Sequence, residues 1–313
     1  MQINEIVKRN DTLLYILTLL RQNYYRLFFD DTRMVRNLYK KRFGKYPNLE
    51  NPCSFAEKIQ CLKLYWYDEL AVRCADKYLV REYVANTIGE EYLNTLIGVY
   101  DSVNTIDFKS LPVKFVVKGT HGSHFNIICR DKNRIDWNKE IVKLKRWSKI
   151  NYYWQNREWV YRDLKPRFIV EEFLDDNTGS SLTDYKFYCF NGEPAFCQVI
   201  RNRGKNESID FYDLEWKHLP FTGLRRIPFA DSKIPKPEGY ELMTDLAKKL
   251  ATPFPFVRAD FYNIFGKIVF GELTFFPQSG LGEFTPIEYD KKIANRLRIS
   301  NYSGDLCEES RTK

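Results

Sequence analysis

Two acidic residues, Asp260 and Glu272, flank an otherwise apolar stretch of the chain. Residues 263–266 between them read Asn-Ile-Phe-Gly, which is typical of a tight turn, so the sequence predicts a hairpin that brings the two carboxylates together. Neighbouring carboxylates need a counter-charge to remain ionised, and a divalent metal ion is the natural candidate. Arg258 stands two positions before Asp260 and therefore lies on the same face of the expected strand.

A second group of residues suits phosphate binding. The apolar segment 114–118 ends at Lys118 and is followed by a loop that contains Gly119, Gly122 and Ser123. Glycines in such a loop let backbone N–H groups approach phosphate oxygens while the lysine supplies positive charge. The loop lacks the Walker pattern, so a buried strand followed by an ordinary glycine turn is the alternative interpretation.

Two further strands carry polar residues at informative places. Segment 168–172 ends in Glu171 and Glu172, where backbone groups and a carboxylate could contact an adenine edge or ribose hydroxyls. The alternative is a strand end with solvated acids. Segment 184–190 places Asp184 and Lys186 among aromatic residues, and a charge in such surroundings requires a partner.

Taken together, these stretches resemble the ATP-grasp superfamily, and in particular its TupA-like branch, which is associated with teichuronopeptide and capsule-type polysaccharide synthesis. The resemblance runs from about Cys53 to Leu297 and is carried by segments 75–84, 114–123, 168–173, 184–192, 258–260 and 272–277. Two positions depart from the pattern of the superfamily. Thr274 stands where a metal-binding asparagine is usual, and His124 stands where a third glycine is usual.

The resemblance implies two α+β lobes that clamp ATP. It assigns Lys77 and Lys118 to the phosphates, with Gly119, Gly122 and Ser123 in the phosphate loop. It places Glu171, Glu172, Phe173 and Leu174 at the adenine hinge, and Asp260 and Glu272, with Thr274 as a poorer ligand, on Mg²⁺. Arg258 would stabilise charge at the reacting centre, and Lys186 would hold phosphate or the acidic substrate.

The activity implied by the resemblance is that of a carboxylate–amine ligase that works through an acyl-phosphate. We expect it to join a uronic acid of a surface polysaccharide, or of its precursor, to an amino acid. A glycan kinase, with Asp184 or His121 as general base, and a glycosyltransferase remain open as alternatives. A further alternative is a non-catalytic module that binds acidic glycan through the basic, Trp-rich segment 143–159, although the same spacing suits a helix with its Trp residues in the core. We expect no nucleic-acid partner.

Composition sets the cellular expectations. The chain has 313 residues and a net charge of +8, which suits either an anionic partner or a solvated basic surface. Seven cysteines without a C-x-x-C pair, together with three histidines, predict reduced thiols and argue against a zinc site. With neither a signal-peptide pattern nor an apolar run of about 18 residues, the sequence predicts a cytoplasmic protein, at most associated with the inner face of the membrane.

The elements that must position these residues are predicted as helices, then a mixed region, then antiparallel strands. Residues 1–75 form a helical region, 76–166 a first lobe, 167–300 a second lobe and 301–313 a loose tail, which indicates α+β architecture and argues against a doubly wound parallel sheet. Ser54 and Glu57 form a capping box, and Asn191-Gly192 marks a hairpin.

The apolar helix expected over 12–29 is interpreted as packing on its own domain, with docking on a membrane surface as the alternative. The helices are expected at 12–29, 33–43, 54–67, 76–87, 137–164, 239–251 and 287–297, and the strands at 97–100, 114–118, 167–171, 185–190, 195–200 and 208–212, before the hairpin.

Overall fold

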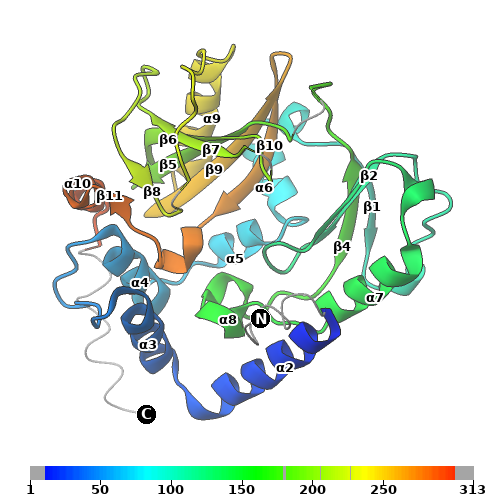
Figure 1. The fold of residues 1–313 in the computed structure, drawn as a ribbon, viewed down its shortest axis with the longest axis horizontal. Coiled ribbons are helices and arrows are strands. Elements are labelled where there is room, and N and C mark those ends of the chain that lie inside the picture. Colours follow the sequence, from blue (N-terminus) through cyan, green and yellow to red (C-terminus); the bar gives the residue numbers. More distant parts are fainter. Residues whose placement is uncertain (1–10, 179–180, 205, 226, 300–313) are drawn as a thin grey trace. The chain divides into compact units, whose positions relative to one another are not determined.

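A computed structural model describes residues 11–178, 181–204, 206–225 and 227–299 (Figure 1). The described chain forms two compact units, and each unit is assembled from two separate pieces of sequence. Unit 1 contains the described residues up to Gly44 together with Leu96–Phe173, and unit 2 contains Lys45–Thr95 together with the described residues from Leu174 onward. The architecture is α+β, as the sequence predicted, with antiparallel pairing throughout the described sheets. The tail expected at 301–313 lies outside the described residues.

Unit 1 is built on a four-stranded sheet with strand order β1-β4-β2-β3. Its strands are β1 (Leu96–Tyr100), β2 (Phe115–Gly119), β3 (Asn126–Cys129) and β4 (Phe168–Glu172). Its helices are α2 (Asp11–Phe28), α3 (Asp31–Phe43), α7 (Trp137–Trp147) and α8 (Tyr153–Asn156), with 3-10 turns η2 (Val103–Thr105), η3 (Lys132–Arg134) and η4 (Trp159–Tyr161).

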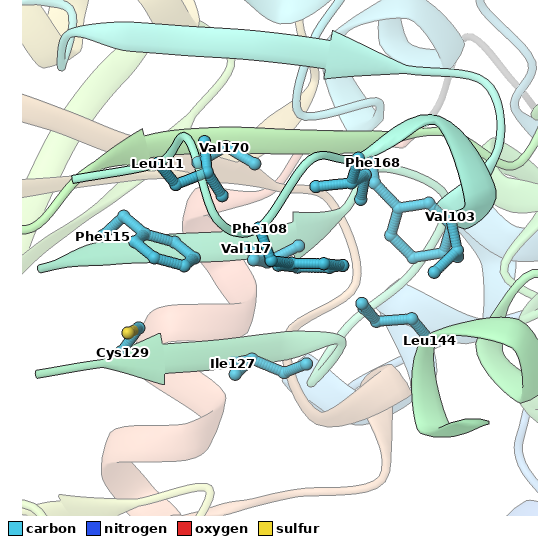
Figure 2. Close-up of a cluster of buried hydrophobic side chains, with 11 residues drawn as sticks. Val103, Phe108, Leu111, Phe115, Val117, Ile127, Cys129, Leu144, Phe168 and Val170 are labelled. Atoms are coloured by element: carbon cyan, nitrogen blue, oxygen red, sulfur yellow. The ribbon is translucent and has the colours of Figure 1, made fainter. Parts of the chain in front are cut away.

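One face of this sheet carries the core of unit 1. Alternate residues of β2 and β4, among them Phe115, Val117 and Val170, point to the same side, where Leu144 of α7 packs against them (Figure 2). The opposite face of the same strands therefore carries Lys118 and Glu171. Alternation along β2 thus separates the core residues from the candidate phosphate lysine.

Unit 2 is built on a five-stranded sheet with strand order β10-β9-β5-β6-β7. Its strands are β5 (Asp184–Phe190), β6 (Glu193–Arg201), β7 (Ser208–Tyr212), β9 (Phe256–Ile264) and β10 (Lys267–Thr274), and the short strands β8 (Thr222–Gly223) and β11 (Phe284–Thr285) pair separately. Its helices are α4 (Phe55–Tyr65), α5 (Glu69–Ala75), α6 (Val80–Thr87), α9 (Tyr240–Ala251) and α10 (Ile287–Arg296), with 3-10 turns η1 (Glu90–Tyr92) and η5 (Pro277–Gly280).

Helix α9 covers one face of the central sheet. The ring of Tyr240 contacts Phe187 of β5 at a centroid distance of 5.5 Å, and Cys189 Sγ lies 3.9 Å from the carbonyl oxygen of Ala247. Both strand residues point to the same side of β5. The other side of β5 consequently carries Asp184 and Lys186, which are the residues of the candidate site.

The observed domain boundaries differ from the predicted ones. Segment 45–75 belongs to unit 2 and not to a separate helical region with residues 1–44, because α4 packs on β-strand residues of unit 2: Phe55 contacts Phe190, Phe256 and Phe284. Strand β4 was expected to open the second lobe, yet it pairs with β1 and β2 and so belongs to unit 1. Proximity in the sequence does not show which segments share a unit when the chain passes between units more than once.

Two predicted helices are shorter than expected. The helix expected over 76–87 begins only at Val80, as α6, because Asp76, which follows α5, accepts hydrogen bonds from the backbone N–H groups of Tyr78 and Leu79 and so turns the chain. The helix expected over 137–164 ends at Trp147 and is followed only by the short α8 and η4. Arg157, at φ +61°, stops α8. The capping box of Ser54 and Glu57 is confirmed.

Candidate active site

The hairpin of β9 and β10 brings the two predicted acids together. Asp260 and Glu272 are direct partners in the strand register, and Thr274 is opposite Arg258. An irregularity between Phe270 and Glu272 shifts the pairing by one residue and sets this alignment. The turn itself has Phe265 and Gly266 at positive φ, as a tight hairpin requires. The prediction that the hairpin juxtaposes the carboxylates is confirmed.

The counter-charge for Asp260 comes from the protein. Arg258 donates two hydrogen bonds to this carboxylate, from Nε to Oδ1 at 2.7 Å and from Nη2 to Oδ2 at 2.6 Å. Lys186, which is opposite Asp260 in the register of β5 and β9, also donates to Oδ2. Since Asp260 is only 3% exposed, two fixed cations are what makes an ionised carboxylate tolerable there. Arg258 and Lys186 therefore compensate the charge of Asp260 without a metal ion at this carboxylate.

Glu272 is the accessible acid of the pair. Its side chain is 40% exposed, and its Oε1 lies 3.3 Å from both Arg258 Nη2 and Thr274 Oγ1. Arg258 also donates to Thr274 Oγ1 at 3.0 Å. Although burial by itself lowers the pKa of Arg258, the charge of Asp260 and the hydrogen bonds to it outweigh that effect and raise it. Arg258 is thus a permanent cation that links all three of these polar side chains.

Asp184 extends the cluster along β5. Its Oδ1 lies 3.4 Å from Lys186 Nζ, and its Oδ2 accepts a hydrogen bond of 2.6 Å from Arg203 Nε. Both Asp184 and Lys186 are buried. Sequence reasoning missed Arg203, because it follows β6 and no spacing rule connects it with a residue nineteen positions earlier. The signal that the sequence offered was the expectation that a charge on this aromatic strand requires a partner.

In unit 1, two residues with separately predicted roles are paired with each other. Lys118 Nζ donates to Glu171 Oε2 at 2.6 Å, across adjacent strands β2 and β4. The side chain of Glu171 is almost fully buried, whereas that of Lys118 is 25% exposed. The pair therefore places the partly exposed Lys118 ammonium on the face of the sheet opposite the core, and the Glu171 carboxylate orients it.

The loop after β2 is held by aromatic packing. A Cβ at Gly119 would lie 2.9 Å from Phe125 Cβ, and one at Gly122 would lie 2.9 Å from the Phe125 ring, so both positions need glycine for close approach. Phe125 stacks on Trp147 with centroids 5.2 Å apart. His124 takes φ +65° without being glycine, and Ser123 Oγ lies 3.0 Å from its Nδ1.

The remaining predicted residues divide between the two units. Glu172 is exposed at the end of β4, and the ring of Phe173 is contacted by the cations of Lys114 and Arg130. Leu174 begins the second piece of unit 2. Lys77 was expected beside Lys118 in the first lobe, but it lies in the turn between α5 and α6 of unit 2.

His121, one of the two candidate bases, is 2% exposed. Its Nε2 lies 2.9 Å from the carbonyl oxygen of Trp147, which can only accept, so Nε2 carries a proton. The other candidate, Asp184, belongs to the same cluster as Arg258 and Lys186 in unit 2, whereas His121 lies in unit 1.

Comparison with known proteins identifies the family. The family described as TupA-like ATPgrasp matches residues 57–298, which is most of the chain. The chain belongs to this family. A comparison with proteins of curated function gave no match.

Several solved structures resemble this TupA-like ATP-grasp protein at low identity. D-alanine–D-alanine ligase from Helicobacter pylori is 18% identical over 77% of this chain and 67% of its own, with a TM-score of 0.39. L-amino acid ligase from Bacillus licheniformis is 12% identical over 82% of this chain and 53% of its own, with a TM-score of 0.42. D-alanine–D-alanine ligase from Bacillus anthracis, complexed with ATP, is 14% identical over 66% and 54%, with a TM-score of 0.36. The chain spans only about half the length of the last two, and TM-scores below 0.5 establish no activity for it.

The oxygen donors of the TupA-like ATP-grasp site fit Mg²⁺. Magnesium prefers oxygen ligands and is usually held by one or two carboxylates plus substrate phosphates and water. Glu272, whose side chain is 40% exposed, and the Thr274 hydroxyl offer such oxygens, whereas both oxygens of Asp260 also accept hydrogen bonds from Arg258 and Lys186. Within the described ranges, no group of three or more His, Cys, Asp and Glu residues forms a self-sufficient metal cage. Two carboxylates suit an ion whose remaining ligands are substrate phosphates and water.

The Trp-rich segment uses its rings internally. Within segment 143–159, Trp147 stacks on Phe125 with centroids 5.2 Å apart, and the guanidinium of Arg157 lies over the Trp154 ring. Trp159 is buried. Rings committed to the core cannot stack on a sugar or a base, so this geometry argues against the interpretation as a glycan-binding or nucleic-acid-binding module.

Proposed function

We propose that this protein is an ATP- and Mg²⁺-dependent carboxylate–amine ligase that joins a uronic acid of a surface polysaccharide, or of its precursor, to an amino acid. The observation that carries the proposal is the cluster of Arg258, Lys186, Asp260 and Glu272 on one sheet face. This cluster combines oxygen ligands for a metal ion with fixed cations for phosphate or carboxylate. Membership of the TupA-like family supports the setting in polysaccharide synthesis.

Each part of the site has a role in this proposal. Asp260 and Glu272, with Thr274, would hold Mg²⁺, which when bound would neutralise charge on the triphosphate. In unit 1, Lys118 and the loop of Gly119, Gly122 and Ser123 serve the phosphates, and Lys77 is the phosphate lysine proposed for unit 2. The segment Glu171, Glu172, Phe173 and Leu174 contacts the adenine, and the ion pair with Glu171 keeps the Lys118 ammonium oriented.

The chemistry proceeds in two balanced steps. A carboxylate oxygen of the acceptor attacks the γ-phosphorus of ATP, and the bond to the β-phosphate oxygen breaks to give an acyl-phosphate and ADP. The amine then attacks the acyl carbon and phosphate leaves with the bonding pair. Arg258 and Lys186 stabilise the negative charge that develops in both steps, and Asp184 accepts the proton that the amine loses. No side-chain nucleophile is required.

A glycan kinase is the second candidate, because the same cations and acids would serve transfer of the γ-phosphoryl group to a hydroxyl. Asp184, 3.4 Å from Lys186, would then deprotonate the sugar hydroxyl. A glycosyltransferase would bind a sugar nucleotide and turn over no ATP.

The deciding experiment follows phosphate release and product mass together. The protein is incubated with ATP, Mg²⁺, uronate-bearing glycans and each amino acid, with hydroxylamine as a trap for an activated carboxyl. The ligase releases ADP and phosphate only with the acid present, forms a hydroxamate with the trap, and adds the mass of an amino acid minus water. A phosphoryl mass gain without free phosphate overturns the ligase in favour of the kinase. Absence of ATP binding in calorimetry, with and without Mg²⁺, overturns both.

A further inference from the structure

Helix α2 packs on its own unit through one side only. Gln22 Nε2 donates to the carbonyl oxygen of Asn151 at 3.0 Å, and Arg157 Nη2 donates to those of Tyr25 and Phe29 at 2.9 and 2.8 Å. Along the same side, the guanidinium of Arg146 lies over the Tyr15 ring. These contacts place α2 against α7 and α8 (Figure 1). Helix α2 therefore packs on its own unit, as the sequence favoured, but it does so through polar and aromatic side chains.

The other side of α2 is apolar and exposed. Seven large side chains of this helix are exposed, and we refer to them as the α2 face: Leu14, Ile16, Leu17, Leu20, Tyr24, Leu27 and Phe28. At 3.6 residues per turn they fall in one arc of about 160°. Leu27 is 74% exposed and Leu20 is 60% exposed, whereas Gln22 is buried. A surface helix normally turns its apolar stripe to the core, and this one does the reverse.

Charge indicates what covers the α2 face. Arg21 is exposed within the same arc, and residues 11–44 contain seven basic residues against three acidic ones. Apolar side chains flanked by cations are typical of helices that lie in the surface of an anionic membrane, where leucines enter the acyl boundary and arginines meet phosphates. A second copy of this chain would instead bring like charges together. Among the described residues, no helix is long and apolar enough to cross a bilayer.

We propose that α2 docks flat on an anionic lipid surface, with the α2 face inserted at the boundary between headgroups and acyl chains. Arg21 contacts lipid phosphates from the same arc. The proposal is independent of the ligase activity, since none of these residues belongs to the candidate active site.

Vesicle flotation with the full chain tests the proposal. The wild type is expected to float with vesicles of phosphatidylglycerol and phosphatidylcholine, to do so less at high salt, and to remain at the bottom with phosphatidylcholine alone. The double variant Leu20→Gln/Leu27→Gln is expected to lower the partition coefficient about tenfold or more, because two inserted leucines lose their apolar contacts. Leu242→Gln is the matched control, since Leu242 is an exposed leucine on helix α9 of unit 2, and it is expected to float like the wild type.

Several outcomes overturn the proposal. These are a wild type that does not float, a double variant that floats like the wild type, and equal binding to both vesicle types. A dimer in sedimentation that dissociates in the double variant, without vesicle binding, assigns the α2 face to a second copy. Circular dichroism establishes that the double variant is folded. If it is not, Arg21→Glu provides the same test through charge, with at least a severalfold loss of binding expected on anionic vesicles.

Discussion

Replacing Asp260 by asparagine isolates the electrostatic role of the buried carboxylate, because the two side chains have nearly the same size. Asp260 receives two hydrogen bonds from Arg258 and one from Lys186. The variant leaves both cations buried, and their remaining contacts with acids are longer, 3.4 Å from Lys186 to Asp184 and 3.3 Å from Arg258 to Glu272, beside the hydrogen bond of Arg258 to the Thr274 hydroxyl. Removing one partner of a buried ion pair costs about 3–5 kcal/mol of stability. We expect Asp260→Asn to destabilise unit 2 by that amount.

The opposite deletion should cost less. In Lys186→Met, Asp184 keeps Arg203 at 2.6 Å and Asp260 keeps Arg258 at 2.6 Å, so neither acid is stranded. The expected loss is about 1–3 kcal/mol, the range for unmade buried hydrogen bonds. In the double variant Asp260→Asn/Lys186→Met, the Lys186 cation that would have lost its partner is absent. The double variant should therefore lose less stability than the sum of the two single variants.

Thermal unfolding followed by circular dichroism measures these differences. For a unit of this size, Asp260→Asn should lower the melting temperature by about 6–20 °C. The matched control is Asp245→Asn on α9, an exposed acid whose neutralisation should leave the melting temperature nearly unchanged. Equal melting temperatures for Asp260→Asn and the wild type, or a larger loss for Lys186→Met than for Asp260→Asn, would refute the assignment of Asp260 as the shared anion of the cluster.

Three further predictions concern other parts of the chain. Lys118→Ala should weaken ATP binding in calorimetry by about 1.5–3 kcal/mol, the range for a charged hydrogen bond, whereas an unchanged dissociation constant would remove Lys118 from the nucleotide site. Burial by itself raises the pKa of Glu57, but hydrogen bonds from the backbone of Asn48, Cys53 and Ser54 lower it overall. The ionised Glu57 carboxylate therefore contributes its full stabilisation above the unfolded pKa of about 4.5, and this contribution is lost as the pH falls through the lower folded pKa. The free energies of unfolding of wild type and Glu57→Gln, measured in urea, should converge in acid, and a constant difference between them would contradict this. Burial raises the pKa of Cys61 and Cys74 to about 12, so alkylation of the native protein at pH 8 should label exposed Cys53 and spare both, which peptide mass mapping would show or disprove.

Local patterns predicted local structure well. The Asn191-Gly192 turn, the capping box of Ser54 and Glu57, and the alignment of Asp260 with Glu272 all follow from interactions between residues close in sequence. In each case, turn chemistry or side-chain reach fixes the geometry without help from the rest of the fold.

Interactions between distant segments could not be predicted from the sequence. Arg203 joins Asp184, and Lys118 joins Glu171, only because particular strands become neighbours in the sheet. Segment 137–164 was predicted as one helix, but Arg157 donates to the carbonyl oxygens of Tyr25 and Phe29 at the end of α2, and the helix is interrupted there. Likewise, the apolar pattern of α2 could not reveal which of its sides would face the protein.

The two-piece construction of each unit constrains the order in which the protein can mature on the ribosome. Helix α4 emerges early, yet Phe55 N–H is satisfied by Asp290, a residue 235 positions later. At about 5–20 residues per second, translation of that interval takes about 12–47 s. During this time the Phe55 ring lacks Phe190, Phe256 and Phe284 for part or all of the interval. Nascent chains stalled before residue 284 should therefore expose the aromatic surface around Phe55 to chaperones. Dividing the gene at a unit boundary would separate segments that need each other to fold.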